Sequence, residues 1–102
     1  MIRVTISYPA QDGARFDFDY YQSKHAELVK AQLAPHGMQD LEINQPLSDG
    51  AGKAPPVVAL ASMLFKDMAS FKAAMAAGGK ALAIDTPNYT DIKPTVLISQ
   101  VI

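Results

Sequence analysis

Hydrophobic and polar residues alternate from Met1 to Tyr8, so that every second side chain is apolar. This period of two predicts a half-buried strand, because successive side chains of a strand point to opposite faces. Three further segments favour strands: a weakly patterned one from Met38 to Leu47, one apolar on both faces from Val57 to Phe65, and a β-branched one from Thr95 to Val101. The pattern therefore predicts four strands, with the third in a central position of its sheet.

Two stretches between these strands follow the helical period instead. The first begins after Asp17, whose carboxylate can accept an orphan amide proton, and it ends at Pro35 and Gly37. The second follows Asp67 as its N-cap, and we expect the Gly78–Gly79 pair to kink or split it. The polar residues of the first helix fall on one side of a wheel of about 3.6 residues per turn. Its inward stripe comprises Phe18, Tyr21, His25, Leu28, Val29 and Gln32.

The elements follow the order β-α-β-β-α-β in a chain of 102 residues, which is long enough for one core and too short for two. That order is typical of a ferredoxin-like α+β sandwich, in which two helices cover one face of an antiparallel four-stranded sheet. We therefore expect a single domain over residues 1–102. Because the last two strands are apolar on both sides, we expect a homodimer that buries the uncovered face, sheet against sheet.

The composition narrows the possible function classes. A net charge of −1 and a pI near 6.0 leave no basic cluster for nucleic acid or anionic lipid. The absence of cysteine excludes disulfides and thiolate chemistry, and with only two histidines we expect no metal site. No apolar run reaches the roughly 18 residues of a membrane span, and the first residues alternate like a strand rather than a signal peptide. We therefore expect a cytoplasmic protein without a membrane partner.

His25 is the most informative polar residue, because it lies in the middle of the inward stripe of the first helix. Burying an imidazole costs roughly 1–3 kcal/mol unless a partner forms a hydrogen bond to it. A backbone carbonyl as partner would make His25 structural, whereas a carboxylate, water or ligand in a cavity would make it functional. Imidazole has an unperturbed pKa of about 6.5, which suits taking and returning a proton at neutral pH.

Two motifs in the chain resemble the EthD family. They are Phe16-Asp17-x-Asp19-Tyr20-Tyr21-x-x-Lys24-His25-x-x-Leu28-Val29 and Tyr89-Thr90-Asp91-Ile92-x-Pro94. The resemblance covers nearly the whole chain and implies a ferredoxin-like subunit that pairs into a dimeric α+β barrel. The same superfamily holds muconolactone isomerases, polyketide cyclases, small monooxygenases and chlorite dismutases. Carried over to the matching positions, the resemblance implies four pocket residues: Tyr21, Lys24, His25 and Asp91.

These positions suit proton transfer next to a carbonyl. Asp91, if it folds against the first helix, would fix the tautomer of His25, and Tyr21 one turn earlier would donate to a developing enolate oxygen. We expect cofactor-free isomerisation, dehydration or cyclisation of a small hydrophobic or aromatic compound. The predicted catalytic residues are His25, Asp91 and Tyr21, and the predicted substrate-binding residues are Lys24, Tyr20 and Tyr89.

The same residues allow other interpretations. The tyrosines could be core aromatics, Lys24 a surface lysine and Asp91 a cap of the turn before the last strand. The competing function is a non-catalytic accessory or carrier protein for an oxygenase or a degradation pathway, and a purely structural dimerisation domain is a third. A single inward histidine can also ligate haem, as it does in some superfamily relatives, and a Soret band in the visible spectrum would overturn the cofactor-free prediction.

Overall fold

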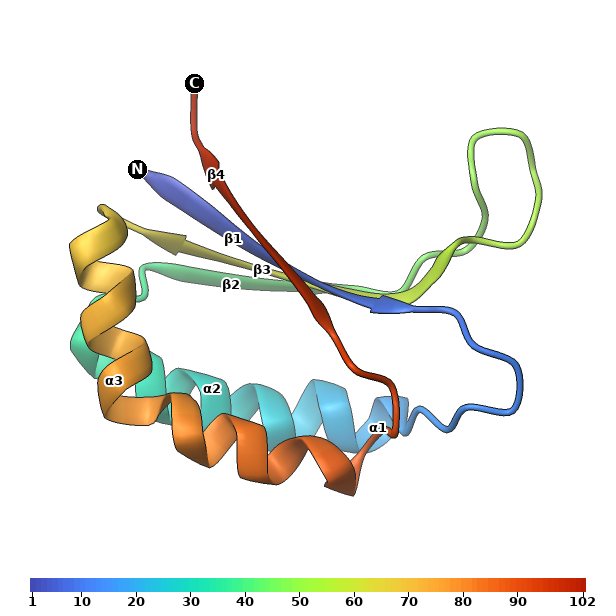
Figure 1. Ribbon diagram of the computed structural model, residues 1–102, viewed down its shortest axis with the longest axis horizontal. Helices are drawn as coiled ribbons and strands as arrows, with labels where there is room; N and C mark the ends of the chain where they lie inside the picture. The colour runs from blue at the N-terminus through green and yellow to red at the C-terminus, as the bar shows by residue number, and fades with distance from the viewer.

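The structure is a computed structural model that describes all 102 residues and consists of a helical layer packed on a sheet (Figure 1). The order β-α-β-β-α-β predicted from the sequence is confirmed. The elements are β1 (Ile2–Pro9), α1 (Phe18–Tyr20), a π-helical turn (Tyr21–His25), α2 (Ala26–Leu33), β2 (Asp40–Asn44), β3 (Val57–Phe65), α3 (Met68–Asp85) and β4 (Thr95–Gln100), with short 3-10 turns at Ala34–His36 and Thr86–Asn88.

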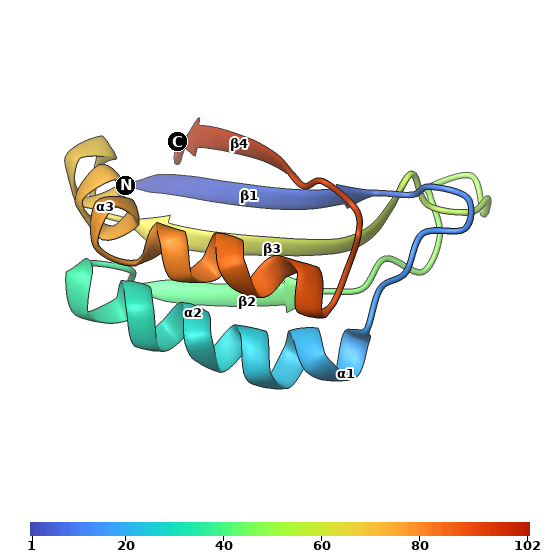
Figure 2. The same ribbon diagram turned by 60° about the horizontal axis from the view of Figure 1, so that its bottom comes forward.

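The four strands form one antiparallel sheet in the order β2-β3-β1-β4. Figure 2 shows α2 and α3 in front of one face of this sheet, with β4 at the upper edge beyond them. The predicted ferredoxin-like α+β fold is therefore confirmed. Because α2 and α3 do not cover β4, all six residues of this strand are exposed.

Both helices begin at the aspartates that the sequence indicated. Asp17 Oδ1 accepts the Tyr20 amide proton at 3.1 Å, and Asp67 Oδ1 accepts that of Ser70 at 2.8 Å. The hydrogen bonds from Ser70 hold the pKa of the Asp67 carboxyl below its ordinary value. From Phe18 to Leu33 the chain is helical without a break, since α1, the π-helical turn and α2 follow one another directly. Helix α3 also runs unbroken, so the Gly78–Gly79 pair does not split it.

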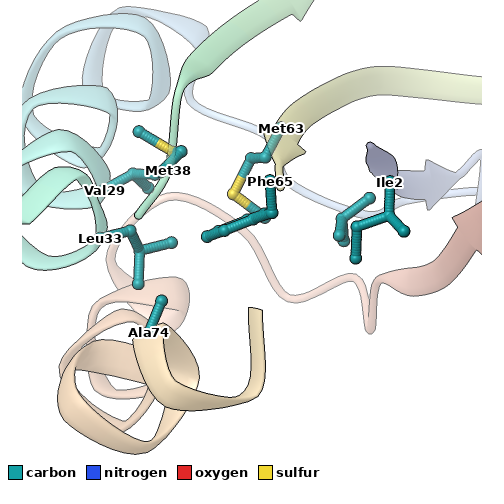
Figure 3. Close-up of a cluster of buried hydrophobic side chains, with 8 residues drawn as sticks. Ile2, Val29, Leu33, Met38, Met63, Phe65 and Ala74 are labelled. Carbon is teal, nitrogen blue, oxygen red and sulfur yellow. The ribbon is translucent and has the colours of Figure 1, made fainter. Parts of the chain in front are cut away.

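The main core lies between the helical layer and the sheet, at the end of the molecule where α3 begins (Figure 3). Phe65 and Leu33 are completely buried there, and Ala74 of α3 packs against them. The cluster comprises Ile2, Val4, Val29, Leu33, Met38, Met63, Phe65 and Ala74. A second, aromatic cluster lies toward the other end, and it comprises Tyr8, Tyr21, Ala59, Ala61, Tyr89 and Ile92.

Helices α2 and α3 approach each other closely at Gly78. A Cβ atom at this position would lie 2.8 Å from both Cβ and the backbone oxygen of Gln32, which is closer than such atoms ever come in proteins. Glycine is therefore required for this helix spacing. The same spacing holds the beginning of α2 beside the end of α3, where His25 and Asp85 lie.

The uncovered face of the sheet differs from the prediction. Strands β1 and β2 present polar side chains on it, because their apolar positions all face the helices. Leu60 and Leu64 of β3 and Leu97 of β4 are apolar positions on this face, and Leu97 is 66% exposed. The exposed apolar surface is thus concentrated along β4, where Val96 and Ile98 on the helix side are also uncovered.

Candidate functional site

A pocket of about 680 Å³ lies between the helices and the sheet, next to β4. Of the 24 residues that line it, 15 are hydrophobic. Small-molecule sites in proteins have this size and this mostly apolar lining, with a few polar groups that orient the ligand. The polar groups include Tyr8, Tyr21, His25 and Tyr89.

The π-helical turn places two of these side chains on the pocket. The amide of Ala26 reaches back to the carbonyl of Tyr21, five residues earlier, so this turn holds one more residue than an α-helical turn. Tyr21, His25, Val29 and Leu33 are therefore all buried although they are four residues apart, a spacing that drifts off the face of an ordinary α-helix. Such turns are rare and occur often at functional sites.

The partner of His25 is a carboxylate, which is one of the partners that the functional interpretation allows, but that carboxylate is Asp85 and not Asp91. His25 Nδ1 lies 2.8 Å from Asp85 Oδ2, and the two side chains are only 8% and 13% exposed. Asp85 is the last residue of α3, which α2 contacts. A carboxylate at this distance accepts the Nδ1 proton and leaves the Nε2 lone pair free to accept another.

Two further side chains hold Asp85 in place. The Tyr20 hydroxyl donates to Asp85 Oδ1 at 2.6 Å, and the Asn88 amide donates to the same oxygen at 3.0 Å. Burial raises the pKa of Asp85, but the hydrogen bonds from Tyr20, His25 and Asn88 outweigh burial and hold the pKa below its ordinary value. Asp85 is therefore ionised at neutral pH, and its charge faces His25.

Tyr89 occupies the other side of the imidazole. Its hydroxyl lies 3.3 Å from His25 Nε2 and 2.6 Å from the hydroxyl of Tyr8, and its side chain is completely buried. Burial raises the pKa of both phenols, and that of Tyr21 as well. These hydroxyls therefore stay protonated and act as hydrogen-bond donors at neutral pH.

The segment around Tyr89 is positioned by a short antiparallel bridge between Phe16 and Thr90. The Asp17 amide donates to the Tyr89 carbonyl at 2.7 Å, and the Thr90 hydroxyl donates to the Arg15 carbonyl at 2.7 Å. Asp91 follows this bridge in the chain, and its Oδ1 accepts the Arg15 amide proton at 2.9 Å. The expected pairing of Asp91 with His25 is therefore wrong: Asp91 lines the pocket but anchors the loop that carries Tyr89.

The remaining predicted site residues fall into two groups. Tyr21, predicted to be catalytic, and Tyr89, predicted to bind substrate, both line the pocket. Lys24 and Tyr20 do not: Lys24 is exposed, with its Nζ 5.6 Å from the centre of the Tyr20 ring, and Tyr20 supports Asp85 instead. Sequence reasoning missed Asp85 and Tyr8. Asp85 lies three residues after Leu82 on the inward side of α3, and an inward carboxylate on a helix is the signal that could have found it.

Comparison of the chain with models of known protein families identifies its family. The model of the EthD domain matches residues 11–93. The chain belongs to the EthD family. Of the solved structures, an EthD-like protein from Ralstonia eutropha JMP134 is 36% identical, with a TM-score of 0.91, over 99% of this chain and 91% of that one.

More distant solved structures share the fold. An EthD family protein from Bacillus halodurans C-125 is 21% identical, with a TM-score of 0.79, over 100% of this chain and 99% of that one. A protein of Arabidopsis thaliana is 13% identical, with a TM-score of 0.68, over 100% of this chain and 96% of that one. The comparison with curated proteins found no match. None of the helices of this EthD domain has the length and apolar character needed to cross a membrane.

The polar side chains of the EthD pocket do not provide free ligands for haem or for a metal ion. A haem iron would require one nitrogen of His25, and both nitrogens already have protein partners in Asp85 and Tyr89. The structure contains no group of three or more histidine, cysteine or acidic side chains that could hold a metal ion.

Proposed function

We propose that this EthD protein binds a small hydrophobic or aromatic carbonyl compound in its pocket and catalyses proton transfer next to the carbonyl group. The observation that supports this most strongly is the Asp85–His25 pair at 2.8 Å, because it opens on a largely apolar pocket. A histidine oriented by a carboxylate is an arrangement that general acid–base catalysis uses.

The roles of the individual side chains follow from their positions. Asp85 orients the ring of His25 and stabilises it when it carries a proton, so that His25 is the proton store of the site. Tyr21 stacks on His25 with ring centres 5.7 Å apart and lines the pocket, so it acts as a ligand-binding group and a donor to an enolate oxygen. The apolar walls exclude water from the reacting carbon and select for a hydrophobic or aromatic substrate.

The exchange of α-hydrogens of an aromatic ketone tests this proposal. 2-Tetralone incubated with the protein in heavy water near neutral pH should lose its α-proton signals, followed by proton NMR, faster than in buffer. His25→Ala should reduce the protein-dependent rate by roughly 100-fold or more, since general acid–base catalysis contributes at least this much. His36→Ala is the matched control, because His36 is the other histidine and lies exposed in the turn after α2.

Two results would refute the catalytic proposal. An unchanged rate in His25→Ala would mean that His25 takes no part in the proton transfer. Binding of the ketone without exchange beyond the buffer rate would favour the accessory or carrier function, because the pocket would then hold a compound without changing it.

We further propose that the chain forms a homodimer through β4. This edge strand exposes apolar side chains on both of its faces, with Val96 53% and Leu97 66% exposed, whereas β1 and β2 turn polar residues to the free face. Monomeric proteins rarely leave a continuous apolar strip of this kind in water. Because Val96 also lines the pocket, a partner subunit on β4 would close the pocket on that side.

A further inference from the structure

Both nitrogens of the His25 ring are already engaged within the protein. Nδ1 is held by Asp85 at 2.8 Å, and Nε2 faces the Tyr89 hydroxyl at 3.3 Å. A ligand in the pocket can therefore receive a proton directly from His25 only if it first displaces Tyr89. Tyr89 is fixed by the bridge to residues 15–17 and has no exposed surface, so its displacement would disturb the aromatic cluster.

The Tyr89 hydroxyl leads instead to a second hydroxyl. Tyr8, on the central strand β1, lies 2.6 Å from it, oxygen to oxygen, and it is another polar residue of the pocket wall. Tyr8 keeps a small exposed fraction of 3%, while Tyr89 has none. The two hydroxyls thus connect His25 on the helical layer with the sheet side of the pocket.

The direction of these hydrogen bonds depends on the charge of His25. When the ring is neutral, Nε2 accepts from the Tyr89 hydroxyl, whose oxygen in turn accepts from Tyr8. When the ring is protonated, Nε2 donates to the oxygen of Tyr89, which then donates to Tyr8, and the Tyr8 proton is free to point to the pocket. One proton added to His25 therefore becomes one proton offered by Tyr8.

We propose that Tyr8 is the group that exchanges a proton with the ligand, with Tyr89 as the relay and the His25–Asp85 pair as the proton store. This inference rests on the proposed function. In the acid direction, the Tyr8 O–H bond breaks as its proton passes to the ligand, the Tyr89 proton replaces it, and the Nε2 proton of His25 passes to Tyr89. The ligand gains one proton and the imidazolium becomes neutral. The base direction is the reverse.

The burial of Tyr8 and Tyr89 favours a proton relay, in which neither tyrosine remains deprotonated, over a mechanism with a stable phenolate. Loss of water raises the pKa of Tyr8 and of Tyr89, so neither holds a negative charge at neutral pH. Each tyrosine must therefore gain one proton as it gives up another, which requires the connected hydroxyls that the structure contains.

Exchange of 2-tetralone α-hydrogens separates this relay from direct action of His25. Tyr8→Phe and Tyr89→Phe should each slow the exchange by roughly 100-fold or more, with the affinity for the ketone changed by less than tenfold. Ser7→Ala is the matched control, because it also removes a hydroxyl from β1 but from the opposite face of the sheet. If Tyr89→Phe exchanges as fast as the wild type while His25→Ala does not, His25 acts directly and the relay is refuted, although the proposed function stands.

A second measurement tests whether the two hydroxyls are connected to His25, as the relay requires. It does not depend on hydrogen exchange, so it can be made even if the wild type exchanges no hydrogen and the proposed function is thereby refuted. The nitrogen-15 NMR signal of His25 Nε2 reports the strength of the hydrogen bond that this atom accepts. Tyr89→Phe should shift the signal toward that of a free acceptor, and Tyr8→Phe should shift it in the same direction by less, because Tyr8 polarises Tyr89. A signal unchanged in Tyr8→Phe would mean that the hydroxyls are not connected, and the relay would be wrong. The assignment of the signal follows from His36→Ala, which leaves His25 as the single histidine.

Discussion

The close approach of α2 and α3 at Gly78 predicts opposite effects for alanine at two neighbouring positions of the same helix. Replacing glycine by alanine inside a helix stabilises it by about 1 kcal/mol through backbone entropy. Both Gly78 and Gly79 lie within α3, so this gain applies to each. The two substitutions differ only in what the new methyl group meets.

At position 78 the methyl group would lie 2.8 Å from Cβ and from the backbone oxygen of Gln32, where normal carbon contacts are about 3.5–4.0 Å. Backbone cannot rotate away, so α2 must shift. Overpacking of this kind costs about 1–3 kcal/mol, and a contact with backbone belongs at the upper end of that range. Gly78→Ala should therefore lose about 2 kcal/mol of unfolding free energy, or roughly 10 °C in melting temperature.

At position 79 the nearest atom is the terminal methyl of Met75, at 2.9 Å, and this flexible side chain can move. Gly79→Ala should therefore be neutral or up to about 1 kcal/mol more stable than the wild type. Urea unfolding of all three proteins at one fixed protomer concentration measures the difference, since dimerisation would make stability depend on concentration. A Gly78→Ala variant as stable as Gly79→Ala would refute the close contact between α2 and α3.

Two other predictions follow from the site and from β4. Because the pKa of Asp85 is held below its ordinary value in the folded state, the stability it contributes is present above the ordinary carboxyl pKa of about 3.9 and is lost as pH falls through the folded pKa. Unfolding free energy should thus fall more steeply between pH 5 and pH 2 in the wild type than in Asp85→Asn, and parallel curves would contradict the charged pair. On β4, Leu97→Glu should convert a dimer to a monomer in analytical ultracentrifugation at micromolar concentration, whereas Ser99→Glu, on the same face, should weaken it less. A wild type that sediments only as a monomer would refute the dimer.

The order of elements could be predicted from the sequence because hydrophobic period and capping residues are local signals. β3 has the predicted bounds of Val57 to Phe65, and Asp17 and Asp67 cap the helices as expected. The predicted inward stripe of the first helix agrees only in part with the residues that are buried in the structure. Leu33 and Ala26 are buried there, while Leu28 and Gln32 are only half-buried. The π-helical turn explains the difference, since a helical wheel assumes the same rotation at every residue.

The environment of His25 could be predicted less well, because its partners come from distant parts of the chain. Asp85 is 60 residues away and Tyr89 is 64 residues away in sequence. A motif places residues on their own element only, and two aspartates near the end of the chain, Asp85 and Asp91, are both possible partners for the one histidine. The helical period can place Asp85 on the inward side of α3, but which histidine or other group it meets there depends on the contact of α3 with α2, which follows from tertiary packing.

The same packing ties the stability of the helical layer to the chemistry of the pocket. Helices α2 and α3 run antiparallel (Figure 1), so the Gln32–Gly78 contact and the His25–Asp85 pair lie about two helical turns apart along both helices. The pair of side chains has a separation of 2.8 Å, and a displacement of α2 by even 1 Å would take it beyond hydrogen-bonding distance. Gly78 therefore supports the His25–Asp85 pair through the helix spacing, although it contacts neither side chain. Its replacement should weaken that hydrogen bond as well as lower the stability of the fold.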